Sequence, residues 1–586
     1  MGRKVYKSLP DMSKARNRVD LPLIKAEEIL VPERVKNFAK GRTYLIKTFG
    51  CQANVRDSEI MAGYLEKAGF CKATDETSAS LVIVNTCAVR ENAEEKVYGE
   101  IGKFKANHTR DKSFVMAVCG CMMQEEKAAE KIVSTYPYVN IVFGTHNISN
   151  LLNLIDEHLG RNKDIVDVIS YPGDIVENLP SIRLDPYKAY VNIAYGCDKF
   201  CTYCIVPYTR GRERSRQKEE IIAECKQLVE EGYQEITLLG QNVNSYGKDF
   251  HDGTSFASIL EEVAKLGIPR LRFMTSHPWD FDDKMIDVIA KYPNIMHFIH
   301  LPVQSGSDDV LRRMGRRYDQ AQYLDLVRRI KQRIPDCALS TDIIVGFPDE
   351  TEEDFQATLD VCEKVGYDSA FTFIYSPRKG TPAAAMKDDV DASTKHERFT
   401  RLVKVIEKSV AAHAEAMIGK TYKVLVDGPS KKDENLLSGY TESNKLVHFV
   451  GPSYLKGKIV EVKINQSHTY SMIGELVDDP LLIMAKEVGR ELSNEPLAKA
   501  YFEAKRAYEE DESASQLRQQ IEDAQKEMAV YANKADDEGH AKAKKAYLEA
   551  KTLYENHPVV KNFETAKEDL EPLLVQVASL INERKE

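Results

Sequence analysis

Three cysteines are spaced as C-x3-C-x2-C within YGCDKFCTYC, residues 195–204. Thiolates at this spacing can hold three irons of a 4Fe-4S cluster and leave the fourth iron open to a ligand from outside the protein. A zinc site would recruit a fourth Cys or His nearby, and none follows Cys204 at zinc-finger spacing. The pattern therefore predicts that Cys197, Cys201 and Cys204 hold a cluster whose open iron chelates a small cofactor.

Three further cysteines, Cys51, Cys87 and Cys121, stand at the ends of apolar stretches that are typical of buried strands. The stretches are TYLIKTFG, LVIVNTC and FVMAVCGC, and helical patterns separate them. This alternation predicts a parallel α/β domain over residues 40–160. Because the carboxyl ends of parallel strands gather at one edge of a sheet, we expect the three cysteines to meet in space.

A second alternation of strands and helices covers residues 183–412. It contains six strand–helix units, the first of which starts with KAYVNIAYGC, and it predicts a partial (β/α)6 barrel of the TIM type. The active site of such a barrel lies at the carboxyl ends of its strands. Since the C-x3-C-x2-C stretch follows the first strand, we expect it at that end.

The rest of the chain shows two other patterns. Residues 417–480 alternate apolar and polar residues between turn residues, which predicts a small antiparallel β-barrel, either an oligonucleotide platform or a structural appendage. Apolar residues recur at helical spacing over 485–586, which predicts a helical bundle with short loops near 536–539 and 556–558. The residues expected in its core include Leu497, Tyr501, Tyr508, Leu570 and Leu574. The predicted fold class is thus multidomain α/β.

Composition bounds the cellular context of the 586-residue chain. No run of 18 apolar residues occurs, and the charged start lacks the apolar stretch of a signal peptide, so we expect a cytoplasmic protein without a membrane segment. Eleven cysteines, an odd number, argue against a disulfide framework and for thiolate ligands. Four of them are expected to pack in cores, namely Cys71, Cys225, Cys337 and Cys362.

The motifs around the cysteines resemble those of the methylthiotransferases, a family of the radical S-adenosylmethionine superfamily. The matching stretches, within residues 40–480, are TFGCQAN, VNTCAVR, GCMMQ, CTYCIVPYTRGRERSR and HLPVQSGSDDVLRRMGRRY. The resemblance implies a second 4Fe-4S cluster, on Cys51, Cys87 and Cys121. The family's GC-x-x-Q motif places the ligand directly after Gly, so Cys119 is expected to pack instead. The segment 417–480 is similar to a TRAM domain, an RNA-binding module.

The resemblance also implies that strand ends of the barrel hold S-adenosylmethionine. The matching residues are Tyr203, Glu235, Gln304, Ser305, Ile344 and Gly346. The superfamily's G-x-I-x-G-x-x-E pattern appears only as DIIVGFPD, in which Asp342 and Asp349 replace the first Gly and the Glu.

Two runs of arginines are candidate contacts to RNA phosphates. The first directly follows the cluster loop and consists of Arg210, Arg212, Arg214 and Arg216. Its position predicts that it holds substrate RNA beside the cofactor. The second consists of Arg312, Arg313, Arg316 and Arg317, and an RNA contact and a solvated helix face both stay open for it.

An aromatic C–H bond cannot be thiolated by acid–base chemistry at neutral pH, so the hard step needs a cofactor radical. The resemblance implies that S-adenosylmethionine is both methyl donor and source of a 5'-deoxyadenosyl radical. It also implies an electron donor and a sulfur source as partners. The target base must leave its stack, which is easiest in a single-stranded loop such as the anticodon loop of tRNA.

Within the family, the chain most resembles one branch, on the stretches CQAN followed by RDSE and IVPYTRGRERSR. That branch methylthiolates C2 of N6-(dimethylallyl)adenosine at position 37 of tRNA. Methylthiolation of N6-threonylcarbamoyladenosine in tRNA, or of a ribosomal protein aspartate, stays open. An iron-sulfur RNA-binding or regulatory protein without catalysis is the alternative from a different class, although binding alone needs no open iron.

The helical tail, residues 485–586, resembles proteins of the YlbF/YmcA type, which are partners in a complex that affects RNA processing, biofilm formation and competence. Residues 481–586 hold 16 Lys and Arg against 22 Asp and Glu, more than half of the net charge of −10. We expect an interaction module whose acidic surface faces a protein partner rather than tRNA.

Overall fold

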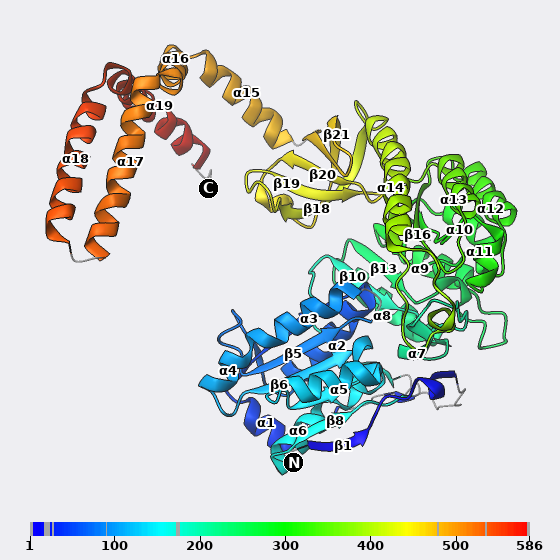
Figure 1. Ribbon diagram of the computed structural model, residues 1–586. Coiled ribbons are helices and arrows are strands. Elements are labelled where there is room, and N and C mark those ends of the chain that lie inside the picture. Colours follow the sequence, from blue (N-terminus) through cyan, green and yellow to red (C-terminus); the bar gives the residue numbers. More distant parts are fainter. Residues whose placement is uncertain are drawn as a thin grey trace. The chain divides into compact units, whose positions relative to one another are not determined.

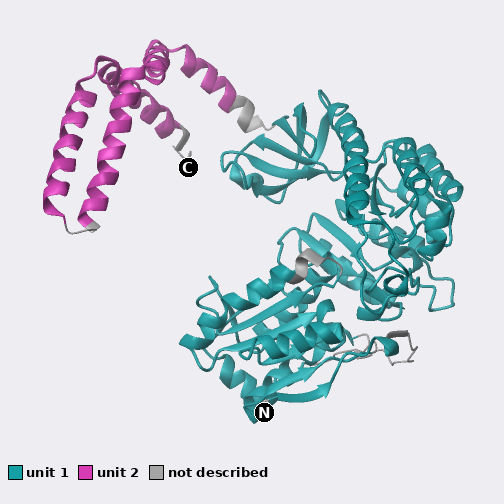
Figure 2. Ribbon diagram, viewed as in Figure 1, with its two compact units in different colours: residues 1–477 teal, residues 478–586 magenta. Residues whose placement is uncertain are grey.

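The computed structural model describes residues 4–16, 24–25, 29–88, 91–170, 176–477, 480–533 and 536–582. The chain forms two compact units, residues 1–477 and 478–586, which are coloured separately in Figure 2. The first unit contains a seven-stranded sheet, a partial barrel and a small closed barrel. The second unit is helical throughout its described residues.

The amino-terminal sheet is parallel throughout, with the strand order β1-β8-β7-β6-β5-β3-β4. Its strands are β1 (Lys4–Ser8), β3 (Thr43–Thr48), β4 (Cys71–Lys72), β5 (Leu81–Thr86), β6 (Val115–Gly120), β7 (Ile141–Phe143) and β8 (Asp164–Asp167). The edge strand β1 lies before the predicted start of this domain at residue 40. Every residue of β5 and β6 is buried, as expected of strands covered on both faces.

Helices cover the two faces of this sheet (Figure 1). One apolar core joins the sheet to α2 (Gln52–Lys67) and α6 (Leu151–Arg161). The other core joins it to α3 (Glu91–Lys103) and α5 (Glu126–Thr135). The loops at the carboxyl ends of β3, β5 and β6, which carry the three cysteines, are thus set by a well-packed frame.

Six parallel strands form the partial barrel, in two three-stranded groups. The strands are β10 (Lys188–Asn192), β13 (Glu235–Leu239), β14 (Arg270–Phe273), β15 (Phe298–His300), β16 (Ala338–Val345) and β17 (Ser369–Ile374). The helices that follow them include α8 (Lys218–Glu230), α9 (Phe256–Lys265), α10 (Asp283–Lys291), α12 (Gln320–Arg333), α13 (Glu352–Val365) and α14 (Ala392–Glu415). A single bridge between Leu271 and Ile295 links the two groups. The predicted six strand–helix units are confirmed.

Five strands close the small barrel in the order β18-β19-β20-β22-β21. They are β18 (Thr421–Pro429), β19 (Leu437–Thr441), β20 (Leu446–Val450), β21 (Ile459–Ser467) and β22 (Ser471–Leu476). The predicted small antiparallel barrel is confirmed in four of its five strand pairs, whereas β20 and β22 run parallel. A closed ring with an odd number of strands cannot alternate direction throughout, so one pair must be parallel.

The second unit consists of α15 (Pro480–Asn494), α16 (Pro496–Glu510), α17 (Glu512–Asn533), α18 (Asp537–Asn556) and α19 (Pro558–Asn582). Helix α17 packs on α18, and α16 packs on α19. The loop predicted near 556–558 lies between α18 and α19, whereas of the loop predicted near 536–539 only residue 536 precedes α18, which begins at Asp537.

Aromatic contacts join α16 to α19. Tyr508 stacks on Phe563 with ring centroids 4.9 Å apart, and Leu570 is buried. The prediction that Leu497 and Leu574 lie in the core is wrong, because their exposed fractions are 42% and 46%. The two helices meet through tyrosine and phenylalanine rings, which leaves these leucines outside the contact.

Among the helices in the described parts of the chain, none is long and apolar enough to cross a membrane. The cytoplasmic location stays a prediction.

Candidate functional site

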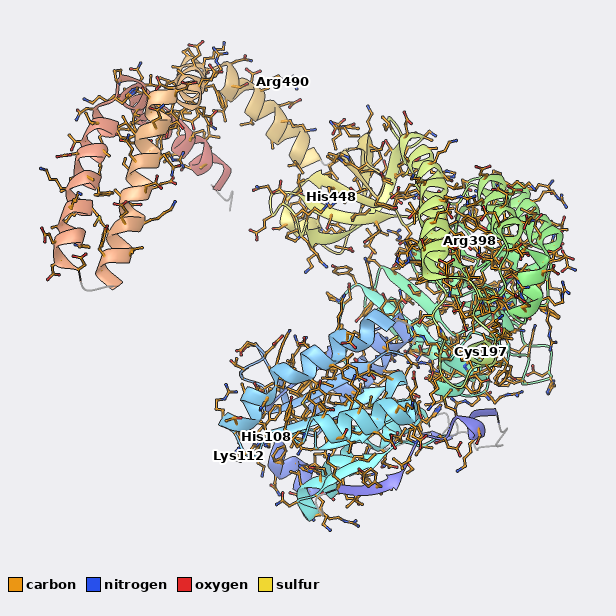
Figure 3. The ribbon with its side chains drawn as sticks, viewed as in Figure 1. His108, Lys112, Cys197, Arg398, His448 and Arg490 are labelled. Carbon is orange, nitrogen blue, oxygen red and sulfur yellow. The ribbon has the colours of Figure 1, made fainter. Side chains whose placement is uncertain are left out.

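The C-x3-C-x2-C cysteines lie in the loop that follows β10 and β11 (Ala194–Tyr195), at the carboxyl end of the first barrel strand. Figure 3 labels Cys197 in this loop. Gly196 has φ +75°, and a Cβ there would lie 2.1 Å from the carbonyl oxygen of Arg212. Glycine at this position therefore lets the two sides of the loop approach, and the amide of Cys197 donates to the carbonyl of Gly211 at 3.1 Å.

Desolvation makes two of these thiols poor free thiolates. It raises the pKa of Cys204 to about 12 and also raises that of Cys197, and the neighbouring thiolates add to both effects. One positive group offsets this, because Nη1 of Arg316 lies 3.5 Å from Sγ of Cys201. Buried thiols that resist deprotonation suit a cationic cluster, which takes the place of the protons and deprotonates the ligands it binds.

The structure brings Cys51, Cys87 and Cys121 together, as expected from the strand ends that carry them. Cys51 is the N-cap of α2, Cys87 follows β5, and Cys121 begins η2 (Cys121–Gln124) after β6. The Sγ atoms of Cys51 and Cys121 both lie 3.9 Å from Oδ1 of Asn54. A Cβ at Gly50, with φ +114°, would lie 2.7 Å from Cβ of Cys87, so the loops meet as closely as glycine permits.

The other cysteines lie apart from these two triads, and all eleven are free thiols. Cys119 is buried with its Sγ 3.7 Å from Sδ of Met61, on the α2 face of the sheet, which agrees with a packing role. The packing prediction is also met by Cys225, Cys337 and Cys362, which are buried. It is wrong for Cys71, which is exposed on the short edge strand β4.

The number of thiols in each triad bears on what the triad can bind. Within the described ranges of the chain, no three His, Cys, Asp or Glu side chains converge as the ligands of one metal ion. A zinc site would draw its sulfur ligands to about 2.3 Å from one point. Each thiolate of a 4Fe-4S cluster binds a different iron, so its ligands are spread around a cluster instead. Each triad supplies three thiols, which is the number of protein ligands that a 4Fe-4S cluster with one open iron takes.

Three of the predicted cofactor residues gather at the cysteine end of the barrel. Tyr203 and Ile344 pack against one apolar cluster, whose buried members are Val310, Met314, Phe347, Tyr375 and Ala383. Gln304 has φ +69°, its amide donates to the carbonyl of Asp342, and its own carbonyl accepts from the amide of Ile344. The end of β16 is thereby tied to the segment after β15.

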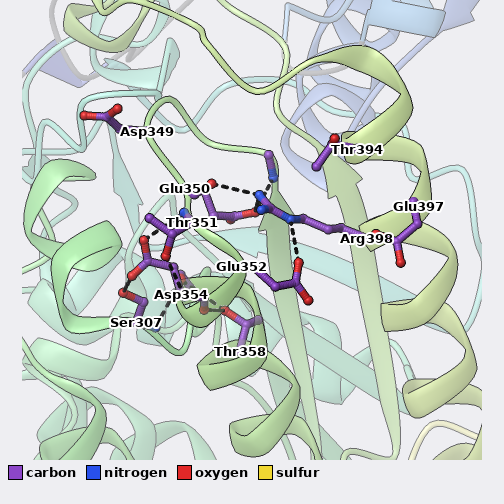
Figure 4. Close-up of polar contacts among 12 residues, drawn as sticks. Ser307, Asp349, Glu350, Thr351, Glu352, Asp354, Thr358, Thr394, Glu397 and Arg398 are labelled. Atoms are coloured by element: carbon purple, nitrogen blue, oxygen red, sulfur yellow. Dashed lines mark hydrogen bonds and ion pairs between the residues drawn. The ribbon is translucent and has the colours of Figure 1, made fainter.

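Ser305 and Gly346 lie at the same end but serve the scaffold. Ser305 is completely buried, and its hydroxyl lies 3.2 Å from that of Thr358. The amide of Gly346 donates to the carboxylate of Glu350 at 2.9 Å, and Arg398 donates to the same oxygen at 3.0 Å (Figure 4). Asp349 stands at the acidic end of the superfamily pattern, whereas the buried Glu350, one position later, binds Gly346.

The structure does not place Glu235 at this end. It is the first residue of β13, at the opposite end of the strand from the cysteine loop. Although burial opposes it, Arg272 and Arg270 lower the pKa of its carboxyl, with the Nε of Arg272 at 2.8 Å. Both arginines also donate to the carbonyl oxygen of Thr441 in the small barrel. Glu235 therefore helps to join the two barrels and lies away from the expected cofactor site.

Two of the four predicted RNA-binding arginines are occupied by buried carboxylates. Arg210, 6% exposed, donates to Asp57 and to Asn54 at 2.7 Å each. Arg216, 7% exposed, binds Glu177 through Nε and Nη2 and also donates to a nearby glutamate. The structure does not offer these two side chains to RNA phosphates, which corrects the prediction.

The other two arginines of this run are half-buried. Arg212 pairs with Asp198 at 2.7 Å, and the guanidinium of Arg214 lies 5.9 Å from the ring centroid of Tyr195. Arg316, from the second run, is buried beside Cys201 and is neither a solvated side chain nor an RNA contact.

Family profiles match consecutive segments of the chain. The Uncharacterized protein family UPF0004 matches residues 43–144, and the Radical SAM superfamily matches 191–362. The TRAM domain matches 415–477, and the profile described as Control of competence regulator ComK, YlbF/YmcA matches 481–584. The predicted order of resemblances along the chain is confirmed.

Among solved structures, a radical S-adenosylmethionine methyltransferase from Kitasatospora setae shares 14% identity, with a TM-score of 0.43 over 58% of this chain and 74% of that one.

Two curated relatives carry the same printed name, tRNA-2-methylthio-N(6)-dimethylallyladenosine synthase. The protein of Geobacillus kaustophilus strain HTA426 is 50% identical over 473 residues, which cover 80% of this chain and 89% of that protein. The protein of Bacillus subtilis strain 168 is 49% identical over 473 residues, which cover 80% and 93%. This similarity, together with the matched radical SAM and TRAM segments, shows that the chain belongs to the family of radical SAM tRNA methylthiotransferases.

Proposed function

We propose that this enzyme methylthiolates C2 of N6-(dimethylallyl)adenosine at position 37 of tRNA. The observation that carries the proposal is the pair of cysteine triads within one compact unit, each at the carboxyl ends of parallel strands. An enzyme that only cleaves S-adenosylmethionine needs one open cluster, whereas insertion of sulfur needs a second place to hold it. The printed names of the relatives support the choice of substrate.

Cys197, Cys201 and Cys204 would hold one 4Fe-4S cluster, and Cys51, Cys87 and Cys121 the other. When bound, the first supplies reductive cleavage of S-adenosylmethionine at its open iron, and the second supplies the site of the sulfur that receives the methyl group. Three of the six thiols, those of Cys87, Cys121 and Cys201, are buried, which limits the access of water to the reacting atoms.

The chain's own residues would position the cofactor. Tyr203, Gln304 and Ile344 lie at the cysteine end of the barrel, where they can line S-adenosylmethionine. The contacts of Gln304 with β16 and of Glu350 with Gly346 fix the shape of this edge before the cofactor binds. Because these hydrogen bonds fix the edge of the barrel, the cofactor would meet its backbone groups rather than mobile side chains.

Arg212 and Arg214 remain the candidate phosphate contacts on the cluster loop, and the five-stranded barrel would hold a further part of the tRNA. Arg270 and Arg272, which both form ion pairs with Glu235, join that barrel to the amino end of β14. The target adenosine must therefore come from a segment that can leave its stack and reach the cysteine end, as an anticodon loop can.

Two alternatives predict other outcomes. Threonylcarbamoyladenosine or a ribosomal protein aspartate as substrate would keep both triads in use, and the names of the relatives favour dimethylallyladenosine. A noncatalytic iron-sulfur protein would need no open iron, and the radical SAM match argues against it.

We further propose that the helical unit is a docking module for a protein partner, on the strength of its YlbF/YmcA match.

The proposal is tested with the anaerobically reconstituted protein, S-adenosylmethionine, dithionite and tRNA that carries dimethylallyladenosine. We expect 5'-deoxyadenosine and methylthiolated nucleoside to form together, measured by mass spectrometry. The Cys121→Ala variant should still form 5'-deoxyadenosine but no methylthiolated nucleoside. If threonylcarbamoyl-tRNA is the better substrate, the branch is wrong, and absence of 5'-deoxyadenosine would support the noncatalytic alternative.

A further inference from the structure

Asn54 joins the loops that carry the amino-terminal cysteines. Its Nδ2 donates to the carbonyl of Phe49 at 2.7 Å and to that of Thr86 at 2.8 Å. These residues stand just before the Gly50-Cys51 turn and just before Cys87. Both amide hydrogens are thus used to hold two cysteine loops in fixed positions, and Asn54 is completely buried.

The amide oxygen of Asn54 faces the thiols. It lies 3.9 Å from Sγ of Cys51 and 3.9 Å from Sγ of Cys121, so it touches the remaining loop as well. It also accepts a hydrogen bond from Nη2 of Arg210 at 2.7 Å. One side chain therefore contacts all three cysteine loops and an arginine from a different part of the chain.

Arg210 brings a buried positive charge to this triad. It follows α7 (Val206–Thr209), directly after the loop of the barrel cysteines, and Asp57 of α2 binds its guanidinium. Its guanidinium lies 2.7 Å from the amide oxygen of Asn54, and that oxygen lies 3.9 Å from Sγ of Cys51 and of Cys121. A buried positive charge at this place acts on the thiols electrostatically.

The barrel triad has a similar neighbour. Arg316 is buried, donates to the carbonyl of Pro302 at 2.7 Å, and lies with Nη1 3.5 Å from Sγ of Cys201. Each triad thus has one buried arginine beside it. A carboxylate binds Arg210 at 2.7 Å, whereas the described hydrogen bonds of Arg316 go to a tyrosine hydroxyl, a carbonyl and the thiol.

We propose that Asn54 and Arg210 are positioning residues for the amino-terminal cluster. Asn54 fixes the three loops at the spacing that the cluster requires, and Arg210 sets the reduction potential of the cluster through its charge. The inference rests on the proposed second cluster. A positive charge stabilises the more negative, reduced state of a cluster, so Arg210 holds its potential above the value it would otherwise have.

The experiment uses the full chain with Cys197, Cys201 and Cys204 all changed to Ala, so that any remaining cluster belongs to the other triad. After anaerobic reconstitution, iron and sulfide are measured, and the midpoint potential is followed by electron paramagnetic resonance. We expect Arg210→Gln to make the potential more negative and Arg210→Lys to restore part of the shift. Asn54→Ala should lose most of the iron.

Two further variants separate charge from folding. Asp57→Asn removes the opposing negative charge while keeping an acceptor for Arg210, so the potential should become more positive. Arg212→Gln is the control, because it removes the same charge from the same loop. In the wild-type chain Arg212 binds Asp198 and not Asn54 or Asp57, so this variant should leave the potential unchanged.

The outcomes distinguish the inference from the proposed function. If the triple-alanine parent holds no iron, the second cluster itself is refuted, and the inference with it. If the parent holds a cluster but Arg210→Gln and Asp57→Asn leave its potential and spectrum unchanged, the inference about Arg210 is overturned. Full iron content in Asn54→Ala would overturn the role of Asn54.

Discussion

Gly50 is the position at which a single methyl group tests the geometry of the amino-terminal triad. Its φ is +114°, and a Cβ built there would lie 2.7 Å from Cβ and 2.9 Å from Sγ of Cys87. The same atom would lie 3.0 Å from Nδ2 of Asn54. Gly50→Ala therefore presses directly on one predicted ligand and on the residue that holds the loops.

The cost has two sources. A residue other than glycine held at such a backbone angle costs on the order of 1–3 kcal/mol. The contacts with Cys87 are shorter than real Cβ contacts, so the loops must also separate. If about 2 kcal/mol of this cost opposes cluster binding, the affinity for the cluster falls ~30-fold.

Iron content and thermal unfolding measure the effect. With two 4Fe-4S clusters the wild-type chain holds about eight irons after reconstitution, and Gly50→Ala should hold about four. Gly69→Ala is the matched control, since Gly69 has φ +101° in the same domain but would bring its Cβ only to 3.8 Å from Ala39. The reasoning is refuted if Gly50→Ala folds and keeps as much iron as Gly69→Ala.

Three further predictions follow from the same structure. Cys121→Ala should lose the amino-terminal cluster while Cys119→Ala keeps it, because Cys119 packs beside Met61 in the core between the sheet and α2; iron loss in Cys119→Ala alone would reverse the assignment. Against the raising effect of burial, three arginines hold the pKa of Glu224 down at about 2, from 4.5. The stability that Glu224 contributes is therefore present above pH 4.5 and is lost as the pH falls toward 2. The difference in thermal stability between wild type and Glu224→Gln should narrow over that window. A difference that stays constant would contradict this prediction. Deletion of residues 485–586 should leave methylthiolation of tRNA intact, and lost activity with intact folding and iron content would contradict a separate docking role.

The convergence of the cysteines was predictable from the sequence because it follows from a rule of topology. Buried apolar stretches such as LVIVNTC identify parallel strands, and the carboxyl ends of parallel strands share one edge. Cys51 and Cys121 could therefore be expected near each other although 70 residues separate them. The six strand–helix units of the barrel were readable for the same reason.

The partners of buried charges were not predictable in this way. Arg210 and Arg216 look like a basic patch in the sequence, but their carboxylates lie 153 and 39 residues away, at Asp57 and Glu177. Only the packing of the domains shows that these charges are already neutralised. Glu235 opens the stretch EITLLGQN, so the rule that puts the site at the carboxyl ends of the strands argues against it, and its assignment rested on the resemblance alone.

Nucleoside mass spectrometry of tRNA from cells with and without this gene tests the central claim most directly. The account predicts that 2-methylthio-N6-dimethylallyladenosine disappears without the gene and that N6-(dimethylallyl)adenosine accumulates in its place. Persistence of that nucleoside together with loss of the threonylcarbamoyl counterpart would contradict the proposed substrate, and an unchanged nucleoside profile would contradict the proposed function.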